Sequence, residues 1–125
     1  MEPNFELNNL RLLHDAEEVE IEVDATPAQP HRVVVWIVTV GCKPYVRSVN
    51  GGEGHWYQLL LAKSVATLHA DDRVIRVRAV PISDSDTQAE ISVEYLRKYA
   101  QYPQDAAWMV APKVCATTLR LEPTL

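Results

Sequence analysis

The segment RSVNGGEGHWY, residues 47–57, contains the residue types that bind an anionic group and a planar ring. Three glycines within four positions permit a ligand to approach the backbone closely. Successive backbone N–H groups ahead of a helix form a concavity that attracts a phosphate or a carboxylate. Trp56 and Tyr57 follow at once, and aromatic faces stack on planar rings. The segment is therefore a candidate site for a small anionic ligand that carries a ring.

The same segment also fits a tight connection between a strand and a helix. In that interpretation the glycines satisfy turn geometry and Trp56 packs in the core. The segment lacks the GK[ST] of a nucleotide-binding P-loop, and its glycine spacing is not the GxGxxG of a dinucleotide fold. The sequence leaves both the ligand-binding and the packing interpretation open.

Other residue types that carry chemistry give weaker signals. His55 has an imidazole that titrates near neutrality, but a histidine beside a helix start is more often a partly exposed polar residue. Ser48 lies near it without a nucleophile elbow or a third residue to orient a base, so we expect a core or loop hydroxyl and assign no catalytic residue. The histidine spacings do not suit a metal site. Cys42 and Cys115 lack a CxxC spacing, and we expect free thiols.

Length and composition indicate one globular domain over residues 1–125. Hydrophobic residues make up 47% and charged residues 23% of the chain, which is typical of a globular protein. The net charge of -5 argues against nucleic acid or an anionic membrane as a partner, because both need a basic face. The first residues do not resemble a secretory signal, so we expect a cytoplasmic protein.

The first half of the chain predicts a helix, three strands and a second, shorter helix. Apolar residues alternate with acidic ones over Glu18–Asp24, which predicts a half-buried strand with an acidic outer face. Val33–Val40 has no such alternation, so we expect it to be the central strand, covered on both faces. The remaining expectations are a helix from Phe5 to near residues 15–17, a loop over residues 25–32 that contains Pro27 and Pro30, a turn at Gly41 and Cys42, a strand over Pro44–Val49 and a helix over Trp56–Ala62.

The second half begins with a predicted hairpin, whose arms Val65–His69 and Arg73–Ile82 flank an Ala-Asp-Asp turn. Arg76 and Arg78 project from one face of the second arm. If this arm lies beside the acidic strand, they pair across the ladder with Glu20 and Glu22. The alternative is that the two arginines receive an anionic ligand.

A longer helix is expected to begin within Ser83–Ile91, where Thr87 and Glu90 fit a capping box. Its buried stripe is Ile91, Tyr95 and Tyr99, and Glu94 with Lys98 forms an exposed pair four residues apart. Tyr95, Tyr99 and Trp108 are expected at the seam between this helix and the sheet, or alternatively as a second wall of a pocket whose rim Lys98 and Tyr102 reach. A loop with Pro103 and Pro112 then leads to a last strand over Ala116–Leu121.

These elements predict a mainly β protein with flanking helices, an α+β fold. Two hairpins, an early strand and a late strand build a small, mostly antiparallel barrel with helices packed outside it. Closure of the barrel protects the edges of the sheet.

Several separated segments resemble the uncharacterised family catalogued as domain of unknown function 2255. They are VWIVTVG, YVRSVNGGEGHWY, KYAQYP and ATTLRLEP, and the resemblance covers nearly the whole chain. The stretch SVNGGEGHWYQLLLAKSVATL also resembles split-barrel proteins related to deazaflavin-dependent nitroreductases and to the flavin-binding pyridoxamine-phosphate-oxidase-like fold. The matching positions are Ser48, Gly51, Gly52, Trp56, Tyr57, Leu59 and Ala62.

The resemblance implies a split barrel that binds a flavin such as FMN, or a deazaflavin, and acts as a small-molecule reductase. In that case the backbone around residues 50–54 holds an anionic group, and Lys43 and Arg47 supply positive charge. Trp56 and Tyr57 lie against the ring of the cofactor. The cofactor-binding residues that it implies are Lys43, Arg47, Ser48, Asn50, Gly51, Gly52, His55, Trp56 and Tyr57.

The resemblance also leaves two alternatives. In the deazaflavin reductases the first hairpin carries a longer turn rich in Gly and Arg/Lys, whereas here it is only Gly41-Cys42-Lys43-Pro44. This short turn favours a non-catalytic module on the same fold that binds another small anion or a partner. A homodimer whose pocket forms between subunits also fits the related flavin-binding barrels.

Overall fold

The computed structural model of the chain describes residues 5–26 and 29–124. Seven strands form one antiparallel sheet in the order β2-β1-β5-β6-β7-β4-β3, which curls into a half-barrel. The strands are β1 (Val19–Thr26), β2 (Gln29–Val35), β3 (Ile37–Val40), β4 (Lys43–Val46), β5 (Val65–Ala70), β6 (Arg73–Pro81) and β7 (Leu119–Pro123). The helices are α1 (Leu7–Asp15), α2 (His55–Lys63), α3 (Ser85–Lys98), α4 (Pro103–Met109) and α5 (Pro112–Cys115), with a single 3-10 turn, η1 (Gly51–Glu53).

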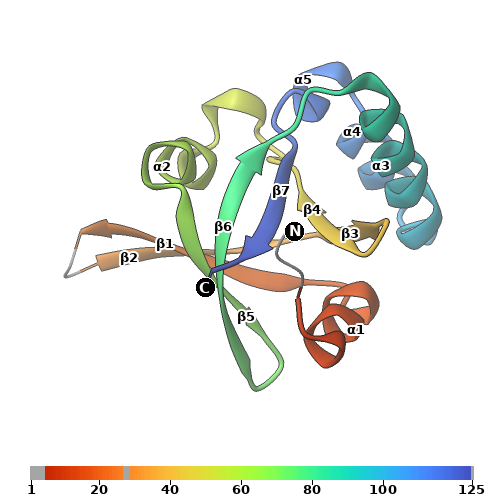
Figure 1. Cartoon of the computed structure of the whole chain (residues 1–125). Helices are drawn as coiled ribbons and strands as arrows, with labels where there is room; N and C mark the ends of the chain where they lie inside the picture. The colour runs from red at the N-terminus through yellow and green to blue at the C-terminus, as the bar shows by residue number, and fades with distance from the viewer. Residues whose placement is uncertain (1–4, 27–28, 125) are drawn as a thin grey trace.

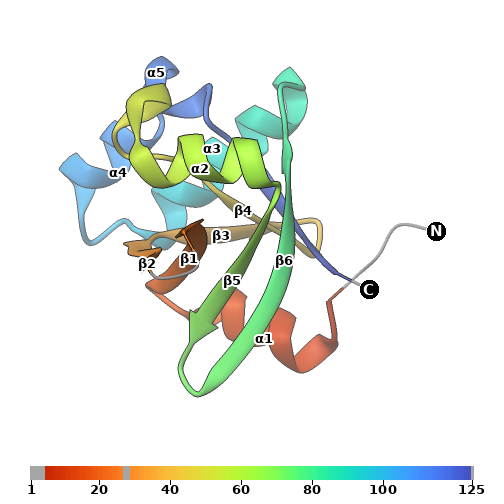
Figure 2. The same ribbon diagram turned by 90° about the vertical axis from the view of Figure 1, so that its left-hand side faces the viewer.

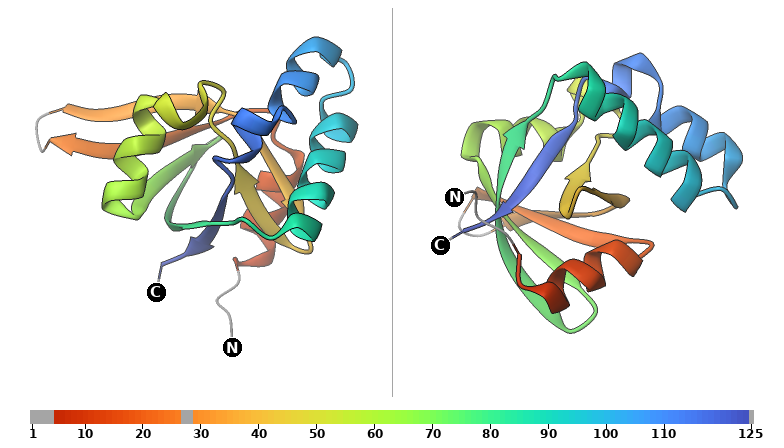
Figure 3. Two further views of the ribbon diagram at one scale, coloured as in Figure 1. Left: turned by 90° about the horizontal axis from the view of Figure 1, so that it is seen from above. Right: turned by 45° about the vertical axis from the view of Figure 1, so that its right-hand side comes forward.

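The helices lie outside the curled sheet, as the sequence predicts. In Figure 1, α2 lies beside the β1–β2 hairpin, and α3, α4 and α5 gather on the other side of β6 and β7. Figure 2 shows α1 at the opposite end of the sheet from α2. Both α1 and α3 contact β3, and Figure 3 shows them on either side of that strand. The predicted split barrel with flanking helices is confirmed.

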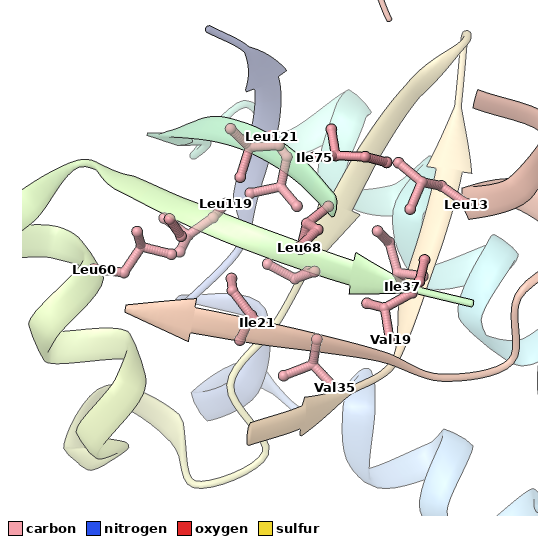
Figure 4. Packing of buried hydrophobic residues seen from close by; sticks show 14 of the residues in the cluster. Leu13, Val19, Ile21, Val35, Ile37, Leu60, Leu68, Ile75, Leu119 and Leu121 are labelled. Carbon is pink, nitrogen blue, oxygen red and sulfur yellow. The ribbon is translucent and has the colours of Figure 1, made fainter. Parts of the chain in front are cut away.

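The core fills the concave side of the sheet with alternating residues from successive strands. In β1 the buried positions are Val19, Ile21 and Val23, so the predicted alternation is confirmed. Figure 4 shows Leu68 of β5 and Leu60 of α2 directed into the same cluster. Each such side chain contributes about 1.5 to 3 kcal/mol by leaving water. A separate cluster beneath α3 contains the predicted stripe of Ile91, Tyr95 and Tyr99.

Both predicted hairpins are present. β3 and β4 pair through a two-residue turn at Gly41 and Cys42, whose φ angles are 58° and 63°. Positive φ at both central residues matches the right-handed twist of the flanking strands, which is why such turns are favoured. β5 and β6 also form an antiparallel hairpin, around Asp71 and Asp72, and of these two residues Asp71 has a positive φ, of 52°.

The prediction of one central strand over Val33–Val40 is wrong. The run divides at Trp36 into the end of β2 and the start of β3, and these two strands form the two edges of the sheet. The predicted loop over residues 25–32 is also wrong for its described part, because β2 already begins at Gln29 and includes Pro30. Proline is tolerated there because an edge strand has one side without a ladder partner. Pro27 lies outside the described residues.

The predicted ladder between the acidic strand and the two arginines is also wrong, because β5 lies between β1 and β6. Glu20 instead pairs with Arg32 on β2, with an Nε–Oε2 distance of 2.9 Å. Glu22 contacts His69 on β5 at 2.8 Å. The arginines find partners on their own neighbours: Arg76 donates to Thr67 Oγ1, and Arg78 pairs with Glu122.

The start of α3 and the loop after it also differ from the prediction. The N-cap is Asp84, whose carboxylate accepts from the backbone N–H of Thr87, so Thr87 is the donor to the cap and not the cap. Glu94 pairs with Arg97 and not with Lys98. The predicted loop contains α4 and α5, and each begins at a proline. The first helical position needs no N–H donor, so proline is suited to it.

Lys98 holds three elements together. Its Nζ donates to Ile37 O at 2.6 Å and to Leu13 O at 3.4 Å, so the end of α3 is tied to β3 and to α1. The Tyr99 hydroxyl donates its hydrogen to Glu17 O at 2.7 Å and accepts from the backbone N–H of Ile37 at 3.1 Å. Burial lowers the pKa of Lys98 from its ordinary value near 10.5 to about 8.

The stability that Lys98 contributes therefore depends on pH. Between about pH 8 and pH 10.5 the unfolded chain binds one proton more than the folded chain, so stability rises with pH in that window. Relative to Lys98→Met, the free energy of unfolding of the wild type should rise by about 1 to 2 kcal/mol from pH 8 to pH 10. Urea unfolding at several pH values measures it. Lys63→Met, at the exposed end of α2, controls for the loss of one positive charge, and a constant difference would contradict the prediction.

Candidate functional site

A groove of about 500 Å³ lies between the edge strand β2, the segment that leads into α2, and α4. We call it the tryptophan groove. Its apolar lining consists of Val33, Val34, Val35, Trp36, Val49, Trp56, Trp108 and Met109. Its polar lining consists of Glu18, Arg47, Asn50, His55 and Asp105. An apolar cavity of this size with a few polar groups is the usual form of a small-molecule site.

Each of the three tryptophans of the groove has a defined contact with a neighbouring residue. Trp36 stacks on Tyr99 with ring centroids 3.8 Å apart and the planes 2° from parallel. Trp56 is buried, with 6% of its surface exposed, and belongs to the main core cluster, as the packing interpretation predicts; its ring meets that of Tyr57 edge-on. Trp108 is 44% exposed, and its Nε1 donates to Val49 O at 2.7 Å. The groove thus has three tryptophans in its lining, each with a defined partner, before any ligand arrives.

The Arg47 side chain is buried below the groove, with 1% of its surface exposed. Its Nε donates to Thr118 Oγ1 at 2.9 Å and its Nη1 to Ser92 Oγ and Met109 O, both at 3.0 Å. Its Nη2 donates to Gln88 O at 3.3 Å and to Gln88 Oε1 at 2.7 Å. A guanidinium has five N–H donors, so these contacts use all of them.

Every acceptor of Arg47 is a neutral hydroxyl, carbonyl or amide. Burial therefore lowers the pKa of Arg47, and the nearby Cys115 and Tyr95 offset part of that effect. The guanidinium also lies 5.3 Å from the centre of the Tyr95 ring, which favours a cation. The buried charge is thus stabilised by dipoles and a ring.

The glycine loop folds back on itself through its own backbone. Gly51 N donates to Ser48 O at 2.9 Å, and Gly54 N donates to Gly51 O at 3.1 Å. Gly51 has a φ of 66°, and a Cβ there would lie 2.9 Å from the side chain of Lys113. Glycine is needed at this position both for the backbone angle and for the stem of Lys113. Two of the N–H groups expected to hold an anion are therefore used within the loop.

Ser48 lies directly beneath the loop. Its backbone N–H donates to Thr117 Oγ1, while its buried Oγ has no hydrogen-bond partner among the described residues. A Cβ at Gly54 would lie 2.3 Å from that oxygen. Gly54 is the N-cap of α2 and provides no side-chain cap. The hydroxyl and the start of α2 are thus packed against each other.

The predicted site residues divide into three groups. Arg47, Asn50, His55 and Trp56 line the groove. Ser48, Gly51, Gly52 and Tyr57 belong to the surrounding loop and helix but do not line it, and Lys43 lies at the turn between β3 and β4. Their cofactor-binding role stays a prediction.

The residues of the lining that sequence reasoning missed are Glu18, Val33–Trp36, Asp105, Val49 and Met109. The first two were read only as parts of strands, and Asp105 fell in a predicted loop. Trp108 was weighed as a second wall, and it does line the groove. The available signal was Trp36, a large aromatic residue interrupting a β-branched run.

The sequence as a whole identifies the family of the protein. A family model described as "Uncharacterized protein conserved in bacteria (DUF2255)" matches residues 9–121. The chain belongs to this family. Among curated proteins, none matches the sequence.

Solved structures similar to this member of the family share its split-barrel fold. HutZ, the heme storage protein from Vibrio cholerae, has a TM-score of 0.67 at 9% identity, over 98% of this chain and 92% of that chain. A FAD-binding protein from Mesorhizobium loti has a TM-score of 0.60 at 13% identity, over 97% and 91%. An F420-H2 dependent reductase (FDR-A) has a TM-score of 0.61 at 14% identity, over 85% and 94%.

At these identities the likeness establishes the fold alone. Several of these proteins bind small molecules, so the family has a fold on which cofactor binding occurs. Cys42 and Cys115 are free thiols, as predicted. Within residues 5–26 and 29–124, no helix has the length and apolar character needed to cross a membrane.

The groove suits the ring of a flavin better than its phosphate. The tryptophan walls and the apolar lining match a planar ring. The phosphate needs cations or open N–H groups, whereas all five donors of Arg47 are used and Lys43 does not line the groove. Lys113, against Gly51, is a cation near the loop that the sequence did not suggest.

The contacts of Arg47 make it a structural centre of the fold. Arg47→Lys keeps one positive charge but has three donors in place of a planar fork of five. We expect a loss of about 2 to 4 kcal/mol in the free energy of unfolding, measured by urea denaturation. The control is Arg76→Lys, because the Arg76 side chain is exposed and its Nη1 donates to Thr67 Oγ1. Equal effects of the two substitutions would contradict this role.

The contact between Ser48 and Gly54 gives a second test. Gly54→Ala should destabilise the protein by about 1 to 3 kcal/mol, because the added Cβ overlaps Ser48 Oγ. Gly52→Ala is the matched control, since a Cβ there meets nothing within 4 Å. Adding Ser48→Ala to Gly54→Ala removes the overlapping oxygen and should recover most of the loss in thermal denaturation. No recovery in the double variant would show that the cost arises elsewhere.

Proposed function

We propose that the protein binds a planar heteroaromatic ligand in the tryptophan groove. A flavin or a deazaflavin is the candidate cofactor, and reduction of a small molecule is the candidate activity. The observation that carries the proposal is the presence of Trp36, Trp56 and Trp108 in the lining of a cavity of about 500 Å³. The fold supports it, since similar structures include a FAD-binding protein and an F420-H2 dependent reductase.

The protein's own contribution in this proposal is to bind, orient and exclude water. When bound, a flavin or deazaflavin supplies the hydride chemistry itself. Val33, Val34 and Val49 offer apolar surface on which a ring can lie, and Val34 is 55% and Val49 51% exposed. Covering these side chains removes apolar surface from water, which favours binding.

The rival is a non-catalytic binding module on the same fold. It is favoured by the short turn at Gly41–Pro44 and by the full use of the Arg47 donors, both of which reduce the charge available to a phosphate. In this alternative the same groove binds a ligand, but the ligand is not a cofactor that exchanges electrons.

A homodimer also belongs to this proposal. β2 is an edge of the sheet, and exposed Val34 lies on it beside the groove. A second copy placed against this edge would cover apolar surface and complete the ladder. In that arrangement the groove would be closed by the partner.

Titration with ring compounds tests the proposed function. Riboflavin, flavin mononucleotide and a deazaflavin are added in turn, and the fluorescence of each ring is followed. We expect saturable quenching, weakened about tenfold or more by Trp56→Ala, because a stacking wall is lost. Circular dichroism checks that this variant is folded, since Trp56 is nearly buried.

A milder pair of variants locates the ring in the groove. Val34→Ser removes exposed apolar surface from the groove and should weaken binding about two- to fivefold. Val74→Ser makes the same change on β6, where the valine is 68% exposed and does not line the groove, and should have no effect. If no ring compound quenches, the groove is not a site for planar ligands and the proposal fails.

A further inference from the structure

Two carboxylates line the tryptophan groove beside its apolar walls. Glu18 lies just before β1, and Asp105 lies in the first turn of α4. Within the described part of the chain, neither has a hydrogen-bond or ion-pair partner. Both line the groove and are exposed, so a ligand in the groove can reach them. A ligand with a positive group would pair with them.

The positively charged group of the groove lining does not offset the negative charge of these two carboxylates where a ligand would bind. The five N–H donors of Arg47 are directed to Thr118, Ser92, Met109 and Gln88. His55 is the remaining titratable group of the lining, and Asn50 is neutral. A phosphate or carboxylate placed here would face two like charges without a strong donor, which is unfavourable.

The tryptophans also favour a positively charged ligand. An organic cation over the face of a tryptophan is attracted by the ring quadrupole, and this attraction grows where water is excluded. Trp36 and Trp108 both line the groove, as do the two carboxylates. Aromatic faces and negative charges thus meet in one cavity.

We propose that the tryptophan groove selects among planar rings by charge and prefers a cationic ring, so that a flavin there would be held by its neutral ring and not by its phosphate. Glu18 and Asp105 pair with the positive charge of a cationic ring, and the tryptophans stack on that ring. This inference rests on the proposed function for one point, that the groove binds a planar ligand, and it adds the charge of that ligand. The groove should then bind cationic rings most tightly, neutral rings less tightly and anionic rings least tightly.

Three planar probes of different charge test the order. Proflavine carries a positive charge near neutral pH, riboflavin is neutral, and flavin mononucleotide is riboflavin with a phosphate. Fluorescence titration should give the tightest binding for proflavine and the weakest for flavin mononucleotide. The affinity for proflavine should fall with added salt, because salt screens exposed charges, while that for riboflavin should change little.

Substitutions of the two carboxylates show whether the groove itself sets the order. Glu18→Gln and Asp105→Asn keep the shape of each side chain and remove its charge. Each should weaken proflavine about two- to fivefold and strengthen flavin mononucleotide, with riboflavin unchanged. Asp86→Asn is the matched control, because Asp86 lies in the first turn of α3, is exposed, and does not line the groove. It changes the net charge equally and should leave all three affinities unchanged.

The outcomes separate this inference from the proposed function. Tighter binding of flavin mononucleotide than of riboflavin would overturn the inference and leave the proposed function standing. An equal effect of Asp86→Asn and Asp105→Asn on proflavine would also overturn it, since proflavine would then respond only to the net charge of -5. Failure of all three probes to bind would overturn the proposed function and the inference together.

Discussion

The buried guanidinium of Arg47 is the interaction on which the rest of the groove depends. A charge removed from water needs every donor satisfied, and here the acceptors come from α3, from the end of α4 and from the residue before β7. Because Arg47 directly follows β4, one side chain fixes this strand against three segments distant in sequence. The glycine loop continues from that fixed point and brings Asn50, His55 and Trp56 into the groove.

The same arrangement determines the charge of the groove. Neutral acceptors stabilise the guanidinium without a carboxylate, so the positive charge is satisfied inside the fold and offers no donor to a ligand. The carboxylates of Glu18 and Asp105 remain at the lining. A fold that buries its cation and exposes its anions in one cavity differs electrostatically from a phosphate cradle, even where the glycine loop looks similar in sequence.

Local features of the fold could be predicted from the sequence, whereas features that depend on sheet order could not. The alternation in β1 and the two-residue turn at Gly41–Cys42 are set by neighbouring residues. Val33–Val40 is apolar in the same way as a central strand, but its two halves lie at opposite edges of the sheet. Pro103 and Pro112 read as loop residues because proline ends helices, yet it also begins them. The part of the groove that comes from the contiguous glycine loop could be predicted from the sequence. The part that comes from β2 and α4 could not, because only the tertiary structure brings these elements to the loop.

The two carboxylates of the groove have different structural reasons to be there. Asp105 lies in the first turn of α4, where a negative charge stabilises the helix dipole whether or not a ligand binds. Asp86 likewise lies in the first turn of α3 and does not line the groove, so helix stabilisation alone accounts for such a residue. Glu18 precedes a strand, and a strand offers no comparable dipole. Glu18 is therefore the carboxylate of the groove that helix stabilisation does not explain, and a positively charged ligand gives it a partner.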